Sequence, residues 1–224
     1  MTRIFTILAA LSVIALLTNL ALGLRTGDMA EETRQMREVA GEYRRASRSL
    51  LSDDQRKESA RRTFEQAREE FQPKLGRLTT HIWVGIVAAL LTLLVNAVAI
   101  TYFLGTARWC REVVETYDLD RELAHASLLN KRRAFFLAFL SMSAILAIVV
   151  FGALADPVRS YRSDLETVVR WRTVHFFVAV LGSGWIILSY FWQIQRIAGN
   201  SKIIRTIMDQ VETRAAQTIA GDAS

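Results

Sequence analysis

Four long apolar runs without charged side chains constrain this chain more than any other feature of its sequence. They cover residues 4–24, 82–105, 134–155 and 174–194. An apolar run of 18 or more residues is long enough to cross a bilayer as an α-helix. Nearly all of the 28 Lys and Arg and 22 Asp and Glu residues lie between the runs. The pattern excludes an ordinary soluble domain, and also a transmembrane barrel, whose strands would be short and alternating.

The first run follows only three residues, so a cleaved signal peptide is the alternative to a membrane helix. The apolar region of a signal peptide has about 7–15 residues. Because this run is longer, we expect an uncleaved anchor. Aromatic residues at the ends of the other runs, among them Trp83, Trp109 and Trp192, are typical of the bilayer interface.

The connection between the first two runs carries two apolar seams with alternating steps of three and four residues, which is the pattern of a coiled coil. The first seam contains Met29, Met36, Val39, Tyr43, Ala46 and Leu50, and the second contains Ala60, Phe64, Ala67, Phe71, Leu75 and Leu78. The seams predict an antiparallel helical hairpin that stands outside the bilayer as a stalk. Asp28 with Glu31 is a start signal for its first helix, and Ser52 with Gln55 fits a capping box for its second. Pro73 should kink the returning helix.

The sequence therefore predicts an all-α protein, a four-transmembrane-helix bundle with an extramembrane antiparallel helical-hairpin (coiled-coil) stalk. The predicted segments are transmembrane helices at 1–24, 81–106, 134–155 and 174–195, the stalk at 25–80, a polar helical connection at 107–133, a short amphipathic helix at 156–173, and an amphipathic tail at 196–224. Val158, Tyr161, Leu165 and Val168 form the apolar face of the short helix. Ile204, Met208, Val211 and Ala215 form one stripe of the tail, which either lies on the membrane or packs on the polar connection.

The orientation follows from basic residues close to the ends of the runs. Of the 28 Lys and Arg residues, 11 lie on the side of the two termini and 17 on the side of the stalk, many of them far from the membrane. The deciding residues are the cluster 131–133 before the third run, together with Arg108 and Arg111 after the second. By the positive-inside rule, we expect a multi-pass protein of the cell (inner) membrane with both termini in the cytoplasm.

Composition excludes several function classes. The net charge is +6, but acidic and basic residues are interleaved, which argues against a nucleic-acid partner. Cys110 is the single cysteine, so an internal disulfide or a multi-cysteine metal site is excluded. The apolar runs contain no charged residue, which argues against an ion or proton pathway. H-E-x-x-H, G-x-S-x-G and Walker motifs are absent, so no class of enzyme is indicated.

A short internal repeat pairs two of the three histidines. Residues 79–86 (TTHIWVGI) align with 173–180 (TVHFFVAV), which places His81 opposite His175 at the start of two spans that run in the same direction. In a helix bundle, facing side chains at one level are where cofactor sites are built. The alternative for each histidine is a ring at the level of the lipid headgroups.

The two histidines suggest a b-type haem as a possible cofactor. Neutral imidazoles of His81 and His175 could hold the iron axially, and Gly85 and Ala179 would give a flat ring room one turn further in. Arg77 and Arg172 could pair with the haem propionates. Asn19 and Asn96 are interpreted as helix-packing residues that do not meet.

A second hypothesis concerns the stalk. Tyr43, Phe64 and Phe71 are large for a thin two-helix hairpin, which suggests contact with a further surface. That surface is a second copy of the chain or a partner in a membrane complex; the alternative is that the 156–173 helix covers the stalk base. Two function classes stay open: a haem electron-transfer or haem-sensing module, and a non-enzymatic scaffold, accessory subunit or signal-transmitting protein. The sequence identifies neither a substrate nor a signal.

Overall fold

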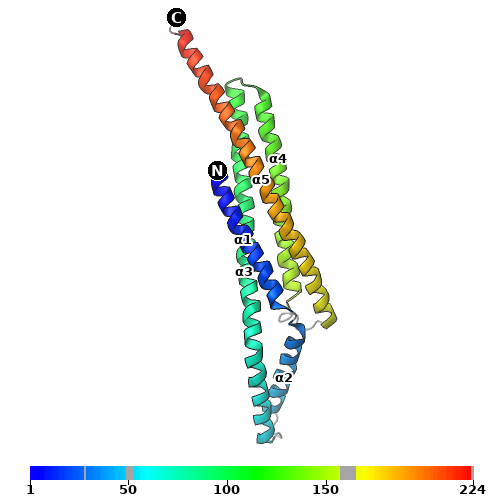
Figure 1. The fold of residues 1–224 in the computed structure, drawn as a ribbon. Coiled ribbons are helices and arrows are strands. Elements are labelled where there is room, and N and C mark those ends of the chain that lie inside the picture. Colours follow the sequence, from blue (N-terminus) through cyan, green and yellow to red (C-terminus); the bar gives the residue numbers. More distant parts are fainter. Residues whose placement is uncertain (28, 49–52, 157–164, 223–224) are drawn as a thin grey trace. The chain divides into compact units, whose positions relative to one another are not determined.

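Five α-helices make up nearly all of the described part of the protein (Figure 1). The computed structural model describes residues 1–27, 29–48, 53–156 and 165–222, and within these residues it contains no strand. The helices are α1 (Thr2–Thr26), α2 (Ala30–Arg48), α3 (Asp54–Thr116), α4 (Arg121–Leu154) and α5 (Leu165–Asp222). The prediction of an all-α chain is confirmed.

Three helices continue well beyond the apolar runs that they contain. Helix α3 joins the second stalk segment, the second run and the start of the polar connection, and it passes through Pro73 without ending. Helix α4 begins in the polar connection and becomes the third run. Helix α5 joins the fourth run to the tail through Gly199 and Asn200. The tail is therefore a continuation of a span.

Four helices are long and apolar enough to cross a membrane: α1, α3, α4 and α5. Only 17% to 33% of the residues in their most apolar windows are buried within the protein. Large apolar side chains such as Leu181 and Phe139, which are 71% and 67% exposed, would be unfavourable in water. This surface is compatible with a membrane protein.

An aspartate lies at the start of helix α3. Helix α3 is capped by Asp53, whose side-chain Oδ1 accepts a hydrogen bond from the backbone N–H of Gln55 at 3.4 Å. The negative charge of this aspartate suits a helix N-terminus. The capping box predicted for Ser52 with Gln55 stays a prediction, because Ser52 is not among the described residues. Asp28, Leu50 and Ser52 lie outside the described residues, as do Val158, Tyr161 and the side chains of Leu165 and Val168.

The contacts divide the chain into two compact units. We call residues Met1–Ile14, Ala89–Leu146 and Gly182–Ser224 the termini unit, and residues Ala15–Ala88 and Ala147–Leu181 the stalk unit.

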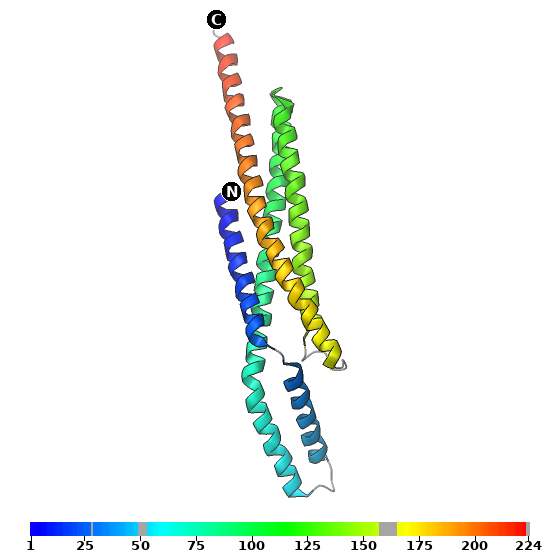
Figure 2. The ribbon, with the colours of Figure 1, turned by 45° about the vertical axis from the view of Figure 1, so that its right-hand side comes forward.

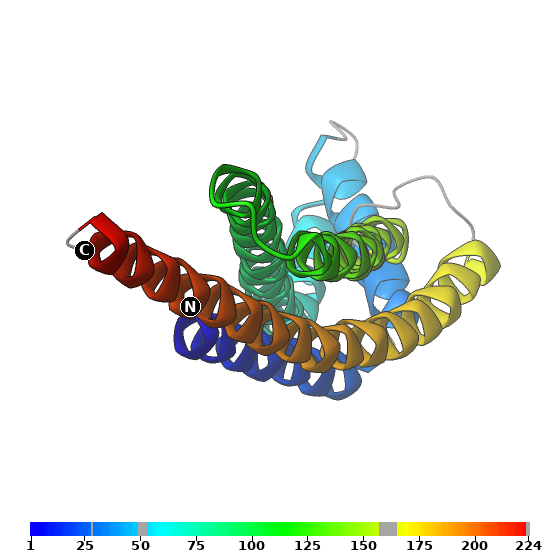
Figure 3. The same ribbon diagram turned by 90° about the horizontal axis from the view of Figure 1, so that it is seen from above.

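A turn at the end of the termini unit joins α3 to α4 and is seen from above in Figure 3. The backbone N–H of Leu119 donates to the carbonyl of Val114 at 2.9 Å, while Asp118 takes a positive φ of 49°. This is the Schellman arrangement with its apolar contact. Asp120 then caps α4, because its Oδ1 accepts from the N–H of Glu122 at 2.9 Å.

The tail packs on the polar connection, which decides between the two alternatives for its apolar stripe. A buried cluster joins the two segments and consists of Cys110, Val114, Leu119 and Ile207, with Ile204 and Val211 packed against it. Met208 is 58% exposed and Ala215 is exposed, so these two members of the stripe take no part in this contact. Burial in this cluster raises the pKa of the Cys110 thiol.

Buried polar side chains connect all four spans within the termini unit. Ser12 of α1 is hydrogen-bonded to Thr92 of α3 at 3.1 Å and to Tyr190 of α5 at 3.0 Å. Gln193 of α5 donates to Asn96 Oδ1 of α3 at 3.0 Å. Ser141 of α4 and Ser189 of α5, the pair that completes this network, are joined at 2.8 Å. Such bonds fix the rotation of each helix where every neighbour is apolar.

Helix α2 and the first part of α3 form a hairpin within the stalk unit, in which the two helices lie side by side (Figures 1 and 2). Lys74 Nζ donates to Glu32 Oε1 at 2.8 Å, and the rings of Tyr43 and Phe64 stack at 5.0 Å. Glu32 comes before Tyr43 in α2, whereas its partner Lys74 comes after Phe64 in α3. The two helices are therefore antiparallel. The bond from Lys74 lowers the pKa of Glu32. Supercoiling of the hairpin stays a prediction.

Candidate functional site

His81 lies at the start of the apolar part of α3, within the stalk unit. Its Nδ1 is 3.1 Å from the backbone carbonyl oxygen of Asn19 on α1. Because a carbonyl only accepts, Nδ1 must carry the proton in this hydrogen bond. In a neutral imidazole the lone pair is then on Nε2.

A glycine on the facing helix lets the His81 ring come this close. A Cβ atom added to Gly23 would lie 3.0 Å from Cε1 of His81 and 3.6 Å from its Nε2. Such an approach is shorter than ordinary van der Waals contact between carbon atoms. The outer edge of the imidazole therefore occupies the space that any other residue at position 23 would fill.

The same two helices make a reciprocal contact one turn away. A Cβ atom added to Gly85 of α3 would lie 3.2 Å from Nδ2 of Asn19. Asn19 and Gly23 are four residues apart on α1, as are His81 and Gly85 on α3, so each helix offers one polar side chain and one glycine. The space beside Gly85 thus holds the Asn19 amide, whose Oδ1 is buried and accepts no hydrogen bond from the described part of the chain.

The second half of the chain repeats the histidine contact. A Cβ atom added to Gly152 of α4 would lie 3.1 Å from Cε1 of His175 on α5. The backbone carbonyl of Ile148, four residues before Gly152, interacts with this ring. Nδ1 of His175 is nevertheless buried and makes no hydrogen bond of standard geometry within the described residues. Ile148 and Gly152 therefore correspond to Asn19 and Gly23.

The burial pattern around the two histidines also repeats. The residues three and four positions after each histidine are covered, whereas those one, two, five and six positions after it are exposed. The covered residues are Val84 and Gly85 in α3, and Val178 and Ala179 in α5. Both histidines thus lie on the inner face of their helix.

The other predicted site residues lie around these contacts or in the stalk. Arg77 and Arg172 are exposed, four and three residues before the histidines on the same helices. Tyr43 and Phe64 stack on each other, with their planes 8° apart, and Phe71 is half-buried. The reciprocal glycines Gly23 and Gly152 did not emerge from the sequence. A search for glycines facing the histidine repeat from the preceding span would have found both.

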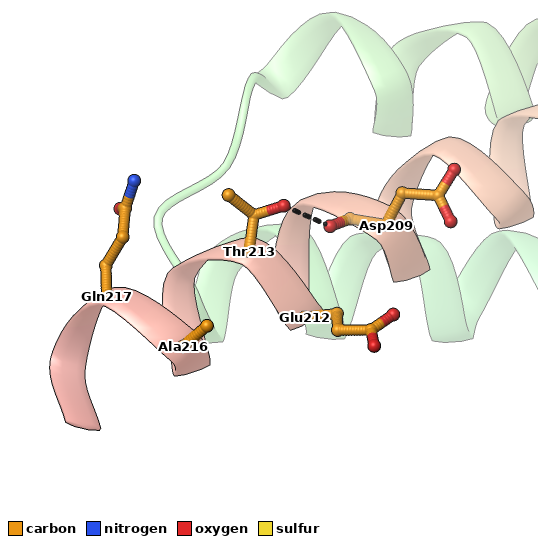
Figure 4. A pocket seen from close by; sticks show the side chains of 5 residues that line it. All are labelled: Asp209, Glu212, Thr213, Ala216 and Gln217. Carbon is orange, nitrogen blue, oxygen red and sulfur yellow. Dashed lines mark hydrogen bonds between the residues drawn. The ribbon is translucent and has the colours of Figure 1, made fainter. Parts of the chain in front are cut away.

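Two pockets lie elsewhere, in the termini unit. One, of about 600 Å³, is lined by five exposed residues of α5. Figure 4 shows these side chains projecting from a single helix, with Thr213 bonded to the carbonyl of Asp209 at 2.8 Å. The other, of about 700 Å³, lies between α3 and α4. Neither pocket is lined by His81 or His175. In the described part of the chain, no group of three or more His, Cys, Asp or Glu residues is arranged to hold a metal ion.

Comparison with known proteins gives no further assignment. No protein-family model matches the chain, and no similar protein was found among the curated proteins or the solved structures.

Proposed function

We propose that this chain is a multi-pass membrane protein that binds one b-type haem through His81 and His175. The observation that carries the proposal is the repeated contact in the stalk unit. Each imidazole lies edge-on against a glycine of the preceding span, and each interacts with the backbone carbonyl four residues before that glycine. Two imidazoles in matching surroundings are a ligand pair that would suit a b-type haem.

The hydrogen bond of His81 supports this assignment. A metal-binding histidine almost always donates its second ring N–H to a carbonyl, a carboxylate or water, which fixes the tautomer and the ring orientation. The carbonyl of Asn19 accepts this hydrogen bond from Nδ1 of His81, so Nε2 would be the nitrogen that holds the iron. The corresponding carbonyl for His175 is that of Ile148, although Nδ1 of His175 makes no hydrogen bond of standard geometry within the described residues.

Arg77 and Arg172 are the residues that we assign to the propionates. Both are exposed and precede the histidines by about one helical turn, so they lie on the same side of their helices as the imidazoles. A guanidinium binds a carboxylate through two parallel N–H donors.

Bound haem would supply one-electron transfer, since an iron with two protein ligands has no position open for oxygen. The role that we assign to the chain is to hold the iron with two imidazoles. The choice between electron transfer and haem sensing depends on the partner.

The histidine variants test this proposal. His81→Ala and His175→Ala should each abolish the Soret and α bands of the reduced protein purified in detergent, because each removes one axial ligand. His125→Ala is the matched control, since His125 is an exposed histidine of α4 in the other unit, and it should leave the spectrum unchanged. Equal spectra for all three variants would overturn the assignment.

We also propose that the protein resides in the cell membrane with both termini in the cytoplasm. A reporter fused after Ser224 or inserted near Leu119 should be cytoplasmic, whereas a reporter inserted at Asp53 should be exported. The basic cluster at 131–133 motivates this expectation. A cytoplasmic reporter at Asp53 would invert the topology.

The stalk supports a second candidate, a scaffold or signalling role through a second copy of the chain or another membrane protein. The Tyr43 and Phe64 rings stack on each other, yet both remain only half-buried in the hairpin, so aromatic surface is left for a partner. Phe64→Ala should then reduce the oligomer mass in mild detergent while the spans stay folded. An unchanged monomeric mass for the wild type and the variant would reject this role.

A further inference from the structure

The half-open pocket between α3 and α4 has the composition of an anion site at a membrane edge. Its volume is about 700 Å³, and its lining includes Arg108, Arg111 and Lys131 together with His125. Among the described residues, no acidic side chain lines it. Nε of Arg108 donates to Glu112 at 2.7 Å, and this carboxylate offsets one of the three basic charges.

The place of the pocket along the helices points to the lipid headgroups. On α3 it starts beside Leu104 and Gly105, where the apolar run ends, and on α4 it reaches Lys131, three residues before the next run begins. Trp109, which is 37% exposed, lies at the same level on α3, and tryptophan is enriched at membrane interfaces.

The lining of the pocket is partly apolar and partly basic. Leu104, which is 49% exposed, and Leu128 provide apolar surface. Lys131 is half-buried, and its Nζ lies 6.0 Å from the centre of the Phe135 ring. An amphiphile with a negatively charged head fits such a pocket better than a free anion, because it covers the apolar and the charged surface together.

We propose that this pocket binds the phosphate of an anionic phospholipid, with Arg111 and Lys131 as the main contacts. This site is independent of the histidine pair and lies in the other unit. In the proposed topology it faces the cytoplasmic leaflet, where anionic lipids attract basic residues.

Native mass spectrometry of the full chain in detergent tests the proposal, with phosphatidylglycerol and phosphatidylcholine as probes. Phosphatidylglycerol should bind more tightly than phosphatidylcholine. The double variant Arg111→Gln/Lys131→Gln should weaken binding of phosphatidylglycerol about thirtyfold, from the usual contribution of two basic residues near a membrane surface. The charge-matched control is Lys202→Gln/Arg205→Gln in the tail, where both residues are exposed and neither lines the pocket, and it should leave binding unchanged.

Three results would overturn the proposal. Equal weakening by the control variant would mean that lipid binding depends on the total positive charge of the protein and not on the residues of the pocket. Equal affinity for the two lipids would mean that the headgroup is not read. Displacement of phosphatidylglycerol by millimolar inorganic phosphate would assign the pocket to a soluble anion. The swap Arg111→Lys/Lys131→Arg keeps both charges and should retain binding even if the neutral double variant fails to fold.

Discussion

Replacing Gly23 with leucine should displace the His81 ring and abolish haem binding. A Cβ atom at this position would already lie 3.0 Å from Cε1 of His81, and leucine adds three more carbon atoms. The ring must then leave the carbonyl of Asn19, and overpacking of this kind costs about 1–3 kcal/mol of folding free energy. Gly152→Leu should do the same to His175. Haem absorbance per chain and unfolding in detergent measure the two effects.

Gly184→Leu is the matched control, because Gly184 is a glycine of an apolar run with no neighbouring atom within 4 Å of an added Cβ. It should keep the haem and stay within about 0.5 kcal/mol of the wild-type stability, as exposed substitutions usually do. If Gly23→Leu behaved like Gly184→Leu, His81 would not occupy the space beside Gly23.

The second large effect concerns the buried pair of Asn96 and Gln193 in the termini unit. Gln193→Met removes the N–H that donates to Asn96 Oδ1, and Asn96 is completely buried. An acceptor left without a donor costs about 1–2 kcal/mol. The double variant Asn96→Leu/Gln193→Met removes both polar groups and should recover most of this loss. Unfolding of the three variants in detergent measures the recovery.

Two features of this pair simplify the comparison of the single and double variants. Ser189 keeps its other bonds to Ser141 and to the carbonyl of Leu137 when Gln193 is replaced, so Asn96 Oδ1 is the acceptor that loses its partner. Gln193 Oε1, in contrast, is already buried without a partner. A double variant less stable than Gln193→Met would mean that packing dominates at this position.

Hydropathy predicted the fold well because a long apolar segment in a bilayer must satisfy its backbone hydrogen bonds internally, as an α-helix does. The four long apolar helices and the antiparallel hairpin followed from run length and seams. The tail stripe is only partly used in the contact with the polar connection, since Met208 and Ala215 are exposed while Ile207 is buried. A single helix pattern does not say which side of an amphipathic helix a neighbouring segment will cover.

Only part of the candidate site could be predicted from the sequence. The repeat identified His81 and His175 because two similar segments can be aligned without knowledge of contacts. Gly23 and Gly152 were missed because they are defined by the facing helix, and the rotation of that helix depends on packing rather than on its own periodicity. For the same reason Gly85, expected to give room to a ring, proved to contact Asn19.

The central claim, that His81 and His175 hold one haem iron, is tested most directly by electron paramagnetic resonance of the oxidised protein, purified from haem-replete cells and assayed for haem per chain. The account predicts about one b-type haem per chain, with the low-spin ferric signal of an iron that has two imidazole ligands. A colourless protein, or a high-spin signal that persists in the wild type, would contradict it.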